Sequence, residues 1–126
     1  MKPPKRDHRL LSNRQYRAVY DRGQKFNTPF FSAFFLPTDN GLQRFGLTTT
    51  RKIGGAVLRN RCRRRLRELF RLRDHTSLDG IGFDVVLNVK PTVATAKYQE
   101  IEAAFSQMLL RFRRAIDKAN PAESAQ

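Results

Sequence analysis

Residues 51–73 concentrate the positively charged side chains of the sequence. This stretch holds ten of the 25 lysine and arginine residues of the 126-residue chain, with a single acid, Glu68. Between Arg59 and Arg67, six of nine residues are arginine. A guanidinium group offers a planar fork of donors that matches phosphate oxygens, and it also stacks on bases. The pattern therefore predicts binding of a polyanion, with the phosphate backbone of a nucleic acid as the leading candidate.

The apolar residues of this stretch recur at helical spacing and predict an amphipathic helix over about residues 56–73. Like charges three or four residues apart on a helix repel one another. The chain offers few acids nearby, so we expect the counter-charge to come from a partner. A nuclear or membrane-surface basic tract is the alternative, but such tracts are usually lysine-rich and need no fold. The apolar stripe consists of Leu58, Cys62, Leu66 and Leu69, with Leu72 at its edge.

The rest of the composition gives little support to protein-borne catalysis. The two histidines, His8 and His75, lie in polar surroundings, the eleven acids are scattered, and no Cys/His set has metal-ligand spacing. We therefore expect no catalytic and no metal-binding residue in this chain. The single cysteine excludes an internal disulfide and, with no apolar run long enough for a membrane span, predicts a cytoplasmic protein. The net charge of +14 again favours a polyanionic partner.

The periodicity predicts one domain over residues 12–118, between a flexible basic N-terminus (1–11) and a flexible tail (119–126). Ser12 followed by Gln15 forms a capping-box pattern, and Gly23 is placed to end the helix that it opens. The turn residues 38–41, Thr-Asp-Asn-Gly, predict a hairpin between the first two strands. The expected elements are helix 12–21, strands 30–36 and 43–50, helix 56–73, strand 83–89 and helix 97–117.

This order, α-β-β-α-β-α, predicts an α+β fold: a two-layer sandwich of a small mixed sheet with helices mainly on one face. The strand at 30–36 is apolar on both faces, so both faces should be covered at least in part. In the strand at 83–89 the odd-numbered residues should face the core, and the even-numbered ones should form a half-polar second face. If its strands are parallel, the crossover through the arginine helix should by default be right-handed.

The arginine stretch also resembles a known signature. Residues 53–58, then Arg59-Asn60-Arg61 and the following Arg63-Arg64-x-Leu66-Arg67, resemble the signature of the protein subunit of bacterial ribonuclease P. The similarity extends over about residues 9–116. Members of that family bind a large catalytic RNA, and the complex trims 5′ leaders from precursor tRNA. The resemblance thus implies an endoribonuclease subunit, chemistry performed by the RNA with Mg²⁺, no obligate protein partner and a left-handed βαβ crossover.

The resemblance implies two sets of binding residues. From the residues alone, Tyr16 and Tyr20 would be core side chains, but the resemblance favours a stacking surface instead. The residues that would contact the catalytic RNA subunit are Arg59, Asn60, Arg61, Arg63, Arg64 and Arg67. The residues that would bind the single-stranded leader of precursor tRNA in a central cleft are Tyr16, Tyr20, Ser32, Phe34 and Asn88, with Arg51, Lys52 and Lys90 at its border.

Three other classes of protein are alternatives to a ribonuclease P subunit. A ribosomal protein would bind RNA structurally, but it would have no need of a strand with aromatic residues on both faces or of the Tyr16/Tyr20 pair. A self-sufficient metal-dependent nuclease would need carboxylates that are better clustered than these. A DNA-binding basic helix is disfavoured because the sequence shows no partner helix or dimer seam.

Overall fold

The computed structural model describes residues 12–73, 78 and 80–119. The expected flexible segments at 1–11 and 119–126 lie outside this part of the chain, except for Ala119, which ends the last helix. So does most of the expected loop after the arginine helix. The described elements are α1 (Asn13–Arg22), β1 (Gln24–Asn27), β2 (Phe31–Thr38), β3 (Gln43–Thr48), η2 (Arg51–Ile53), α2 (Ala56–Arg71), β4 (Gly82–Val89), η3 (Pro91–Ala94) and α3 (Tyr98–Ala119).

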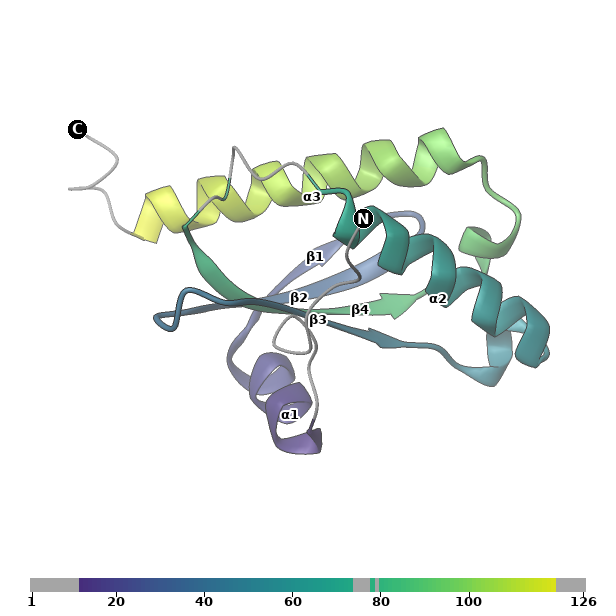
Figure 1. The fold of residues 1–126 in the computed structure, drawn as a ribbon, viewed down its shortest axis with the longest axis horizontal. Helices are drawn as coiled ribbons and strands as arrows, with labels where there is room; N and C mark the ends of the chain where they lie inside the picture. The colour runs from purple at the N-terminus through teal and green to yellow at the C-terminus, as the bar shows by residue number, and fades with distance from the viewer. Residues whose placement is uncertain (1–11, 74–77, 79, 120–126) are drawn as a thin grey trace.

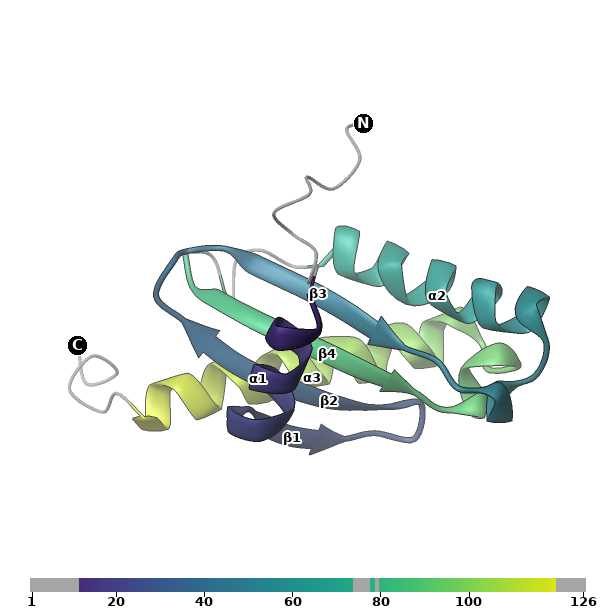
Figure 2. The same cartoon turned by 90° about the horizontal axis from the view of Figure 1, so that it is seen from below.

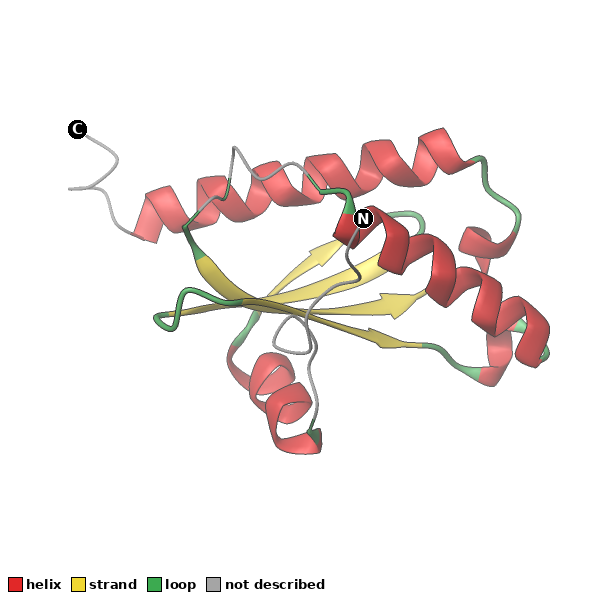
Figure 3. Cartoon of the chain, in the orientation of Figure 1, coloured by secondary structure: helices red, strands yellow, loops and turns green. Residues whose placement is uncertain are grey.

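The described elements form the predicted α+β sandwich. The strands make one mixed sheet in the order β1-β2-β4-β3, in which β4 runs antiparallel to β2 and parallel to β3. Both long helices, α2 and α3, lie on one face of the sheet, whereas the short helix α1 lies on the other (Figure 1). The colouring by secondary structure in Figure 3 shows the same layers, with the strands between the two sets of helices.

Strand β4 lies inside the sheet and is buried on both faces for most of its length. Its odd-numbered residues, Phe83 to Val89, are buried toward α2 and α3, as the alternation predicts. On the other face, Val86 is fully buried against Val19 of α1. A strand that is buried on both faces is best placed in the middle of a sheet, where other elements cover it from both sides. The two strands beside it provide the pairing that satisfies its backbone groups.

The predicted hairpin between the second and third strands is wrong. The turn itself forms: the amide oxygen of Asn40 accepts hydrogen bonds from Thr38 and Leu42, and Gly41 has a φ of 75°. The two strands nevertheless do not pair, because β4 lies between them. At residue 82 a Cβ atom would lie 2.7 Å from Thr38 Oγ1 and 2.8 Å from the Gly41 nitrogen. The turn therefore packs over the start of β4, where only glycine fits.

A hairpin exists instead between β1 and β2, and β1 was not predicted. The strand has only four residues and lies at the edge of the sheet, with Phe26 opposite Ala33. Three of its residues are exposed, so it lacks the apolar run that would indicate a strand. The observed order is therefore α-β-β-β-α-β-α.

The connection from β3 through α2 to β4 is left-handed. In Figure 2 both arrows point the same way while α2 lies behind the sheet, and the step from β3 to β4 turns in the left-handed sense. The right-handed default is therefore wrong here. The handedness implied by the family resemblance is confirmed.

Aromatic pairs join the two long helices to the sheet. Phe112 of α3 stacks on Phe35 of β2 with ring centroids 3.8 Å apart, and Phe70 of α2 stacks on Phe45 of β3 at 4.4 Å. The predicted stripe of α2 is buried in its middle, at Cys62, Leu66 and Leu69. The stripe is less buried at its two ends, where the side chains of Leu58 and Leu72 are 40% and 55% exposed. Burial raises the pKa of the Cys62 thiol, in keeping with its predicted role as a small core side chain.

Helix α1 begins with the predicted capping box. Ser12 accepts from the Gln15 nitrogen, and the Gln15 side chain accepts from the Ser12 nitrogen. Gly23 ends the helix, but its backbone is extended with a φ of −79°, so no left-handed conformation requires a glycine. A Cβ at this position would instead press on the Val19 carbonyl oxygen and lie 3.0 Å from that of Phe35. Glycine is needed here for the close approach of α1 to β2.

We predict that Gly23→Ala lowers the free energy of unfolding by about 1–3 kcal/mol, because the crowding atoms are backbone and can give way only by moving α1. Gly55→Ala is the matched control. Gly55 also has a negative φ, and a Cβ there meets nothing within 4 Å, so its effect should be the smaller one, limited to the weaker capping of α2 by alanine. Urea unfolding of the two variants measures both values, and equal effects would contradict the argument from crowding.

Candidate nucleic-acid interface

Helix α2 presents a basic surface on the side that faces away from the core. Asn60, Arg63, Arg64 and Arg67 line a hollow of about 440 Å³ together with Arg71 and Glu68. The base of the hollow is the stacked pair Phe45–Phe70. We call the set Asn60, Arg63, Arg64, Arg67 and Arg71 the arginine surface.

The positive charge of this surface is mostly not neutralised by the described residues. Their ion pairs are Arg44–Asp84, Glu68–Arg71 and Arg113–Asp117, of which only the second lies on α2. Arg63 donates to the neutral amide oxygen of Asn60 at 3.2 Å. Three arginines, at 63, 64 and 67, therefore share one helix face with no carboxylate of the described chain within 4.0 Å. Such a surface fits a polyanion that spans several turns of a helix.

Two other arginines of the basic stretch serve the fold. Arg65 donates to the Val93 carbonyl oxygen at 2.7 Å and so ties α2 to η3. Arg73 lies over the Phe70 ring at 3.9 Å and donates to Gln43 and to the Phe70 carbonyl. Burial lowers the pKa of Arg73 to about 10, which still leaves it charged at neutral pH. The number of arginines in the stretch is therefore larger than the number that a ligand could reach.

The opposite face of the sheet carries a row of polar side chains across all four strands. Asn27 of β1 pairs with Ser32 of β2, Ser32 pairs with Asn88 of β4, and Asn88 pairs with Thr48 of β3. Because side chains alternate along a strand, all four point to the α1 side. The Ser32 hydroxyl donates to Asn27 Oδ1 at 3.0 Å. We call this row, together with the rings of Tyr16, Tyr20 and Phe34 beside it, the trough.

Tyr20 of α1 leans over this row. Its hydroxyl donates to Asn88 Oδ1 at 2.7 Å and forms a second hydrogen bond with Thr48 Oγ1 at 3.1 Å. Its ring meets Phe34 edge to face, with centroids 4.9 Å apart. The residue remains 37% exposed. Tyr20 is therefore held in one orientation with part of its ring surface open, as a stacking platform requires.

Tyr16 and Phe34 complete the aromatic wall, and both are half-buried. They pack beside Val19 and Val86 where α1 meets the sheet. Burial raises the pKa of the Tyr16 phenol, so the ring carries no charge at neutral pH. Its hydroxyl reaches the Leu47 carbonyl oxygen only at 3.5 Å. Tyr16 is therefore compatible with both predictions, a core side chain and a stacking surface, because one part of its ring is buried and the rest is exposed.

Cations stand at the border of the trough. Lys25 Nζ lies 5.7 Å from the centre of the Phe34 ring, and Lys90 Nζ donates to Asn27 Oδ1 at 2.7 Å and to the Thr28 carbonyl oxygen at 2.6 Å. Arg51 and Lys52 are exposed in η2, just beyond the end of β3. Within the described chain, none of these four cations has a carboxylate within 4.0 Å.

The structure groups most of the residues that the sequence analysis singled out. Asn60, Arg63, Arg64 and Arg67 line one hollow, but Arg59 and Arg61 do not. At 100° per residue, Arg59 and Arg61 fall on opposite flanks of α2. Tyr20, Ser32, Phe34 and Asn88 lie together on the α1 face, with Tyr16 beside them. The residues that the sequence analysis missed are Lys25, Asn27 and Thr48.

Lys25 and Asn27 were missed because strand β1 was not predicted. Thr48 lies in the predicted strand 43–50, but it is the first of three consecutive threonines, so its polarity does not single it out. The sequence alone does not place Thr48 next to Asn88, because that inference requires the knowledge that β3 lies beside β4.

The part of the chain that the structure describes has neither a membrane-spanning helix nor a cluster of metal-ligating side chains. None of its helices combines the length and the apolar character that crossing a membrane requires. Within the same residues, no three side chains of the His, Cys, Asp and Glu types lie close enough together to hold a metal ion.

The fold and its surfaces define a class: a small basic α+β sandwich with a left-handed crossover and an arginine-rich crossover helix. Residues 5–113 match the family model described as Ribonuclease P. The ribonuclease P protein component of Finegoldia magna is 38% identical over 96 residues, which is 76% of this chain and 82% of that protein. The corresponding protein of Syntrophus aciditrophicus is 34% identical over 98 residues, 77% of this chain and 80% of that protein. The chain belongs to the ribonuclease P protein family.

Solved structures agree on the fold. The RNase P protein from Thermotoga maritima superposes with a TM-score of 0.71 at 24% identity, covering 82% of this chain and 96% of that chain. A Staphylococcus aureus RNase P protein gives a TM-score of 0.67 at 21% identity, covering 83% and 94%. At these identities the likeness shows the shared architecture.

We predict that Tyr20→Phe lowers the free energy of unfolding by about 0.5–1.5 kcal/mol, because it removes a hydroxyl with two hydrogen-bond partners. Tyr16→Phe is the control. It removes a hydroxyl whose one hydrogen bond is long, so its effect should be smaller, within about 0.5 kcal/mol. Chemical denaturation compares the two variants, and a larger effect of Tyr16→Phe would contradict the assignment of Tyr20 as the residue that joins α1 to the polar row.

Proposed function

We propose that this protein is the protein subunit of ribonuclease P, which binds a catalytic RNA subunit and the 5′ leader of precursor tRNA and so assists endonucleolytic 5′ maturation of tRNA. Family membership supports the assignment to this ribonucleoprotein enzyme. The observation that carries the division of labour is the presence of two basic surfaces on different faces of the sheet. One lies on α2 and the other faces α1 (Figure 1).

The arginine surface is the proposed site for the catalytic RNA. Arg63, Arg64 and Arg67 project from one helix face at the rim of a hollow that is wide enough to admit part of a nucleotide. Guanidinium groups bind phosphate oxygens through paired donors, and each phosphate that is bound releases counterions from the RNA. Arg59 and Arg61, on the two flanks of the helix, would extend this interface to neighbouring strands of a folded RNA.

The trough is the proposed site for the leader. A single strand exposes base faces and edges as well as phosphates, and the trough offers groups for all three. Tyr16, Tyr20 and Phe34 offer ring surface, and the polar row offers hydrogen-bonding groups. Arg51, Lys52 and Lys90 stand where phosphates would pass. Mature tRNA lacks the leader, so interactions made here favour precursor over product without direct participation in chemistry.

The proposal assigns Mg²⁺ mainly to the RNA partner. Hard cations require several oxygen ligands in one place. Among the described residues no three His, Cys, Asp or Glu side chains gather at one place, and Asp84, Glu68 and Asp117 are each engaged by an arginine. In this proposal the residues of the chain hold and orient RNA, and the groups that cleave the phosphodiester belong to the partner.

We predict that Arg64→Gln or Arg67→Gln weakens binding to the catalytic RNA. Each should also make the dependence of log K on log salt shallower by about 0.7–0.9 for every phosphate that the variant no longer neutralises. Arg113→Gln on α3 is the charge-matched control, since its guanidinium is paired with Asp117. Binding measured across a salt series gives the slopes. An unaltered slope for both α2 variants would argue against direct binding of phosphate.

We predict that Tyr20→Ala lowers affinity for precursor tRNA by about 5- to 150-fold, the equivalent of about 1–3 kcal/mol for one stacked base. Affinity for mature tRNA should be unchanged, and Tyr16→Ala should act in the same direction. Tyr20→Phe serves as the control because it keeps the ring, and most of the preference for precursor should survive. If the reconstituted complex keeps its full preference for precursor with both tyrosines changed to alanine, the trough does not bind the leader.

A further inference from the structure

A second basic groove lies along the C-terminal half of α3, beyond the turn that joins β1 and β2. We propose that this groove binds the distal part of the single-stranded 5′ leader, after the strand has left the trough and crossed that turn. The inference rests on the proposed leader-binding function of the trough and names a further surface for the same substrate. The lining residues that matter for binding are Asn27, Thr28, Gln107, Leu110, Arg111 and Arg114.

Asn27 connects the two surfaces. On the trough side its Oδ1 accepts from Lys90 Nζ at 2.7 Å and from the Ser32 hydroxyl at 3.0 Å. On the α3 side its backbone carbonyl oxygen faces the Arg111 guanidinium at a longer distance of 3.4 Å. One residue of the turn thus has a cation on each side. A phosphate backbone that leaves Lys90 and passes over the turn therefore meets Arg111 next.

The turn is built rigidly enough to guide a strand. The Thr28 hydroxyl donates to the Phe31 carbonyl oxygen at 2.8 Å and accepts from the Phe30 and Phe31 nitrogens. The Thr92 hydroxyl donates to the Pro29 carbonyl oxygen at 2.7 Å, which ties the turn to η3. Because these bonds hold the turn from both sides, the path from trough to groove needs no rearrangement of the protein.

The surface beyond the turn is hollowed. A small hollow of about 70 Å³ lies between the turn and α3, and a wider one of about 280 Å³ follows along the helix. Gln107 and Arg111 line both hollows, so the two adjoin. Leu110, at 49% exposure, lines the wider one. An exposed apolar side chain beside two arginines offers a surface for a base while phosphates bind the guanidinium groups.

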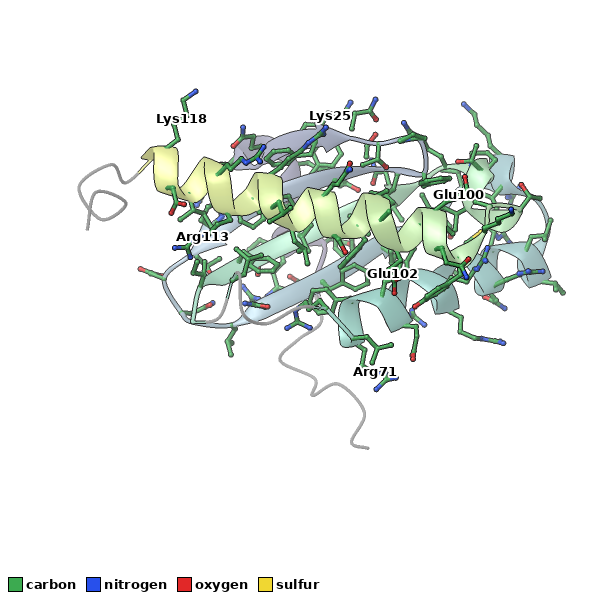
Figure 4. The ribbon with its side chains drawn as sticks, turned by 90° about the horizontal axis from the view of Figure 1, so that it is seen from above. Lys25, Arg71, Glu100, Glu102, Arg113 and Lys118 are labelled. Carbon is green, nitrogen blue, oxygen red and sulfur yellow. The ribbon has the colours of Figure 1, made fainter. Side chains whose placement is uncertain are left out.

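Charge is segregated along α3 in a way that suits this ligand. Figure 4 shows Glu100 and Glu102 at one end of the helix and Lys118 at the other, with Lys25 on the β1 side. Arg111 and Arg114 are exposed, and no described carboxylate lies within 4.0 Å of either. Arg113 has Asp117 at 3.3 Å. The cations that face the groove are therefore available to a polyanion, whereas the one between them is already paired.

A narrow groove with about one cation per helical turn fits a single strand better than a duplex. Its continuity with Lys90 identifies the strand as the one in the trough. A leader that is long enough should therefore gain affinity from Arg111 and Arg114, and a short leader should not.

The test uses the complete ribonucleoprotein, reconstituted with its catalytic RNA, and precursor tRNAs with leaders of about 4 and about 16 nucleotides, the range over which single-strand grooves bind. With the unaltered protein, the long leader should bind more tightly. Arg111→Gln should lower affinity for the long-leader precursor by about two- to five-fold, the equivalent of an exposed charge pair. Adding Arg114→Gln should lower it further. Affinity for the short-leader precursor should be unchanged in both.

Arg113→Gln is the matched control, because it removes one charge from the same helical turn outside the groove. Equal effects of Arg111→Gln and Arg113→Gln, equal weakening with long and short leaders, or no gain from the longer leader would each overturn the inference. Failure of the trough has a different signature: the preference for short-leader precursor over mature tRNA would then be insensitive to Tyr16 and Tyr20. Failure of the α3 groove alone leaves that sensitivity intact.

Discussion

The structure depends on the insertion of β4 between β2 and β3. This strand is paired on both edges and is buried on both faces for most of its length. One face supports α2 and α3 and contributes to the core. The other supports α1 and contributes Asn88 to the polar row. The two nucleic-acid surfaces that we propose are therefore held by the same strand, which fixes their separation and orientation while keeping them on different sides of the molecule.

The charged side chains fall into two groups, those in ion pairs and those on the proposed binding surfaces. The few acids that the structure describes near cations are used in pairs: Asp84 with Arg44 beside α1, Glu68 with Arg71 on α2, and Asp117 with Arg113 on α3. Each pair helps to fix the orientation of its arginine. The remaining cations gather on α2, around the trough and along α3. Such a distribution costs self-repulsion in the isolated protein, and a polyanionic partner relieves it.

Sequence patterns predicted the helices closely because their apolar spacing and caps are local features. The capping box at Ser12 and the buried middle of α2 show this. Strand neighbours were harder to predict, since the same turn at residues 38–41 is compatible with a hairpin and with two strands that diverge around a third. Strand β1 carries too little apolar signal to be found. Family resemblance, and not periodicity, gave the correct handedness and moved Tyr20 from core to surface. No local pattern could show that Thr48 and Asn27 flank Asn88 and Ser32, because register is a property of the finished sheet.

The polar row draws one side chain from each strand, so it exists only when all four are in place. Asn27 and Thr48, at its two ends, belong to the two edge strands and are joined into one row only through Ser32 and Asn88 of the inner strands. A molecule that occupies the row consequently recognises the completed domain and has nothing to bind in a partly formed one. By mass action, its binding energy adds to the cohesion of the whole sheet. Binding at this row and the assembly of the sheet would in this way be thermodynamically linked, because the complete sheet forms the row and a ligand of the row stabilises the complete sheet.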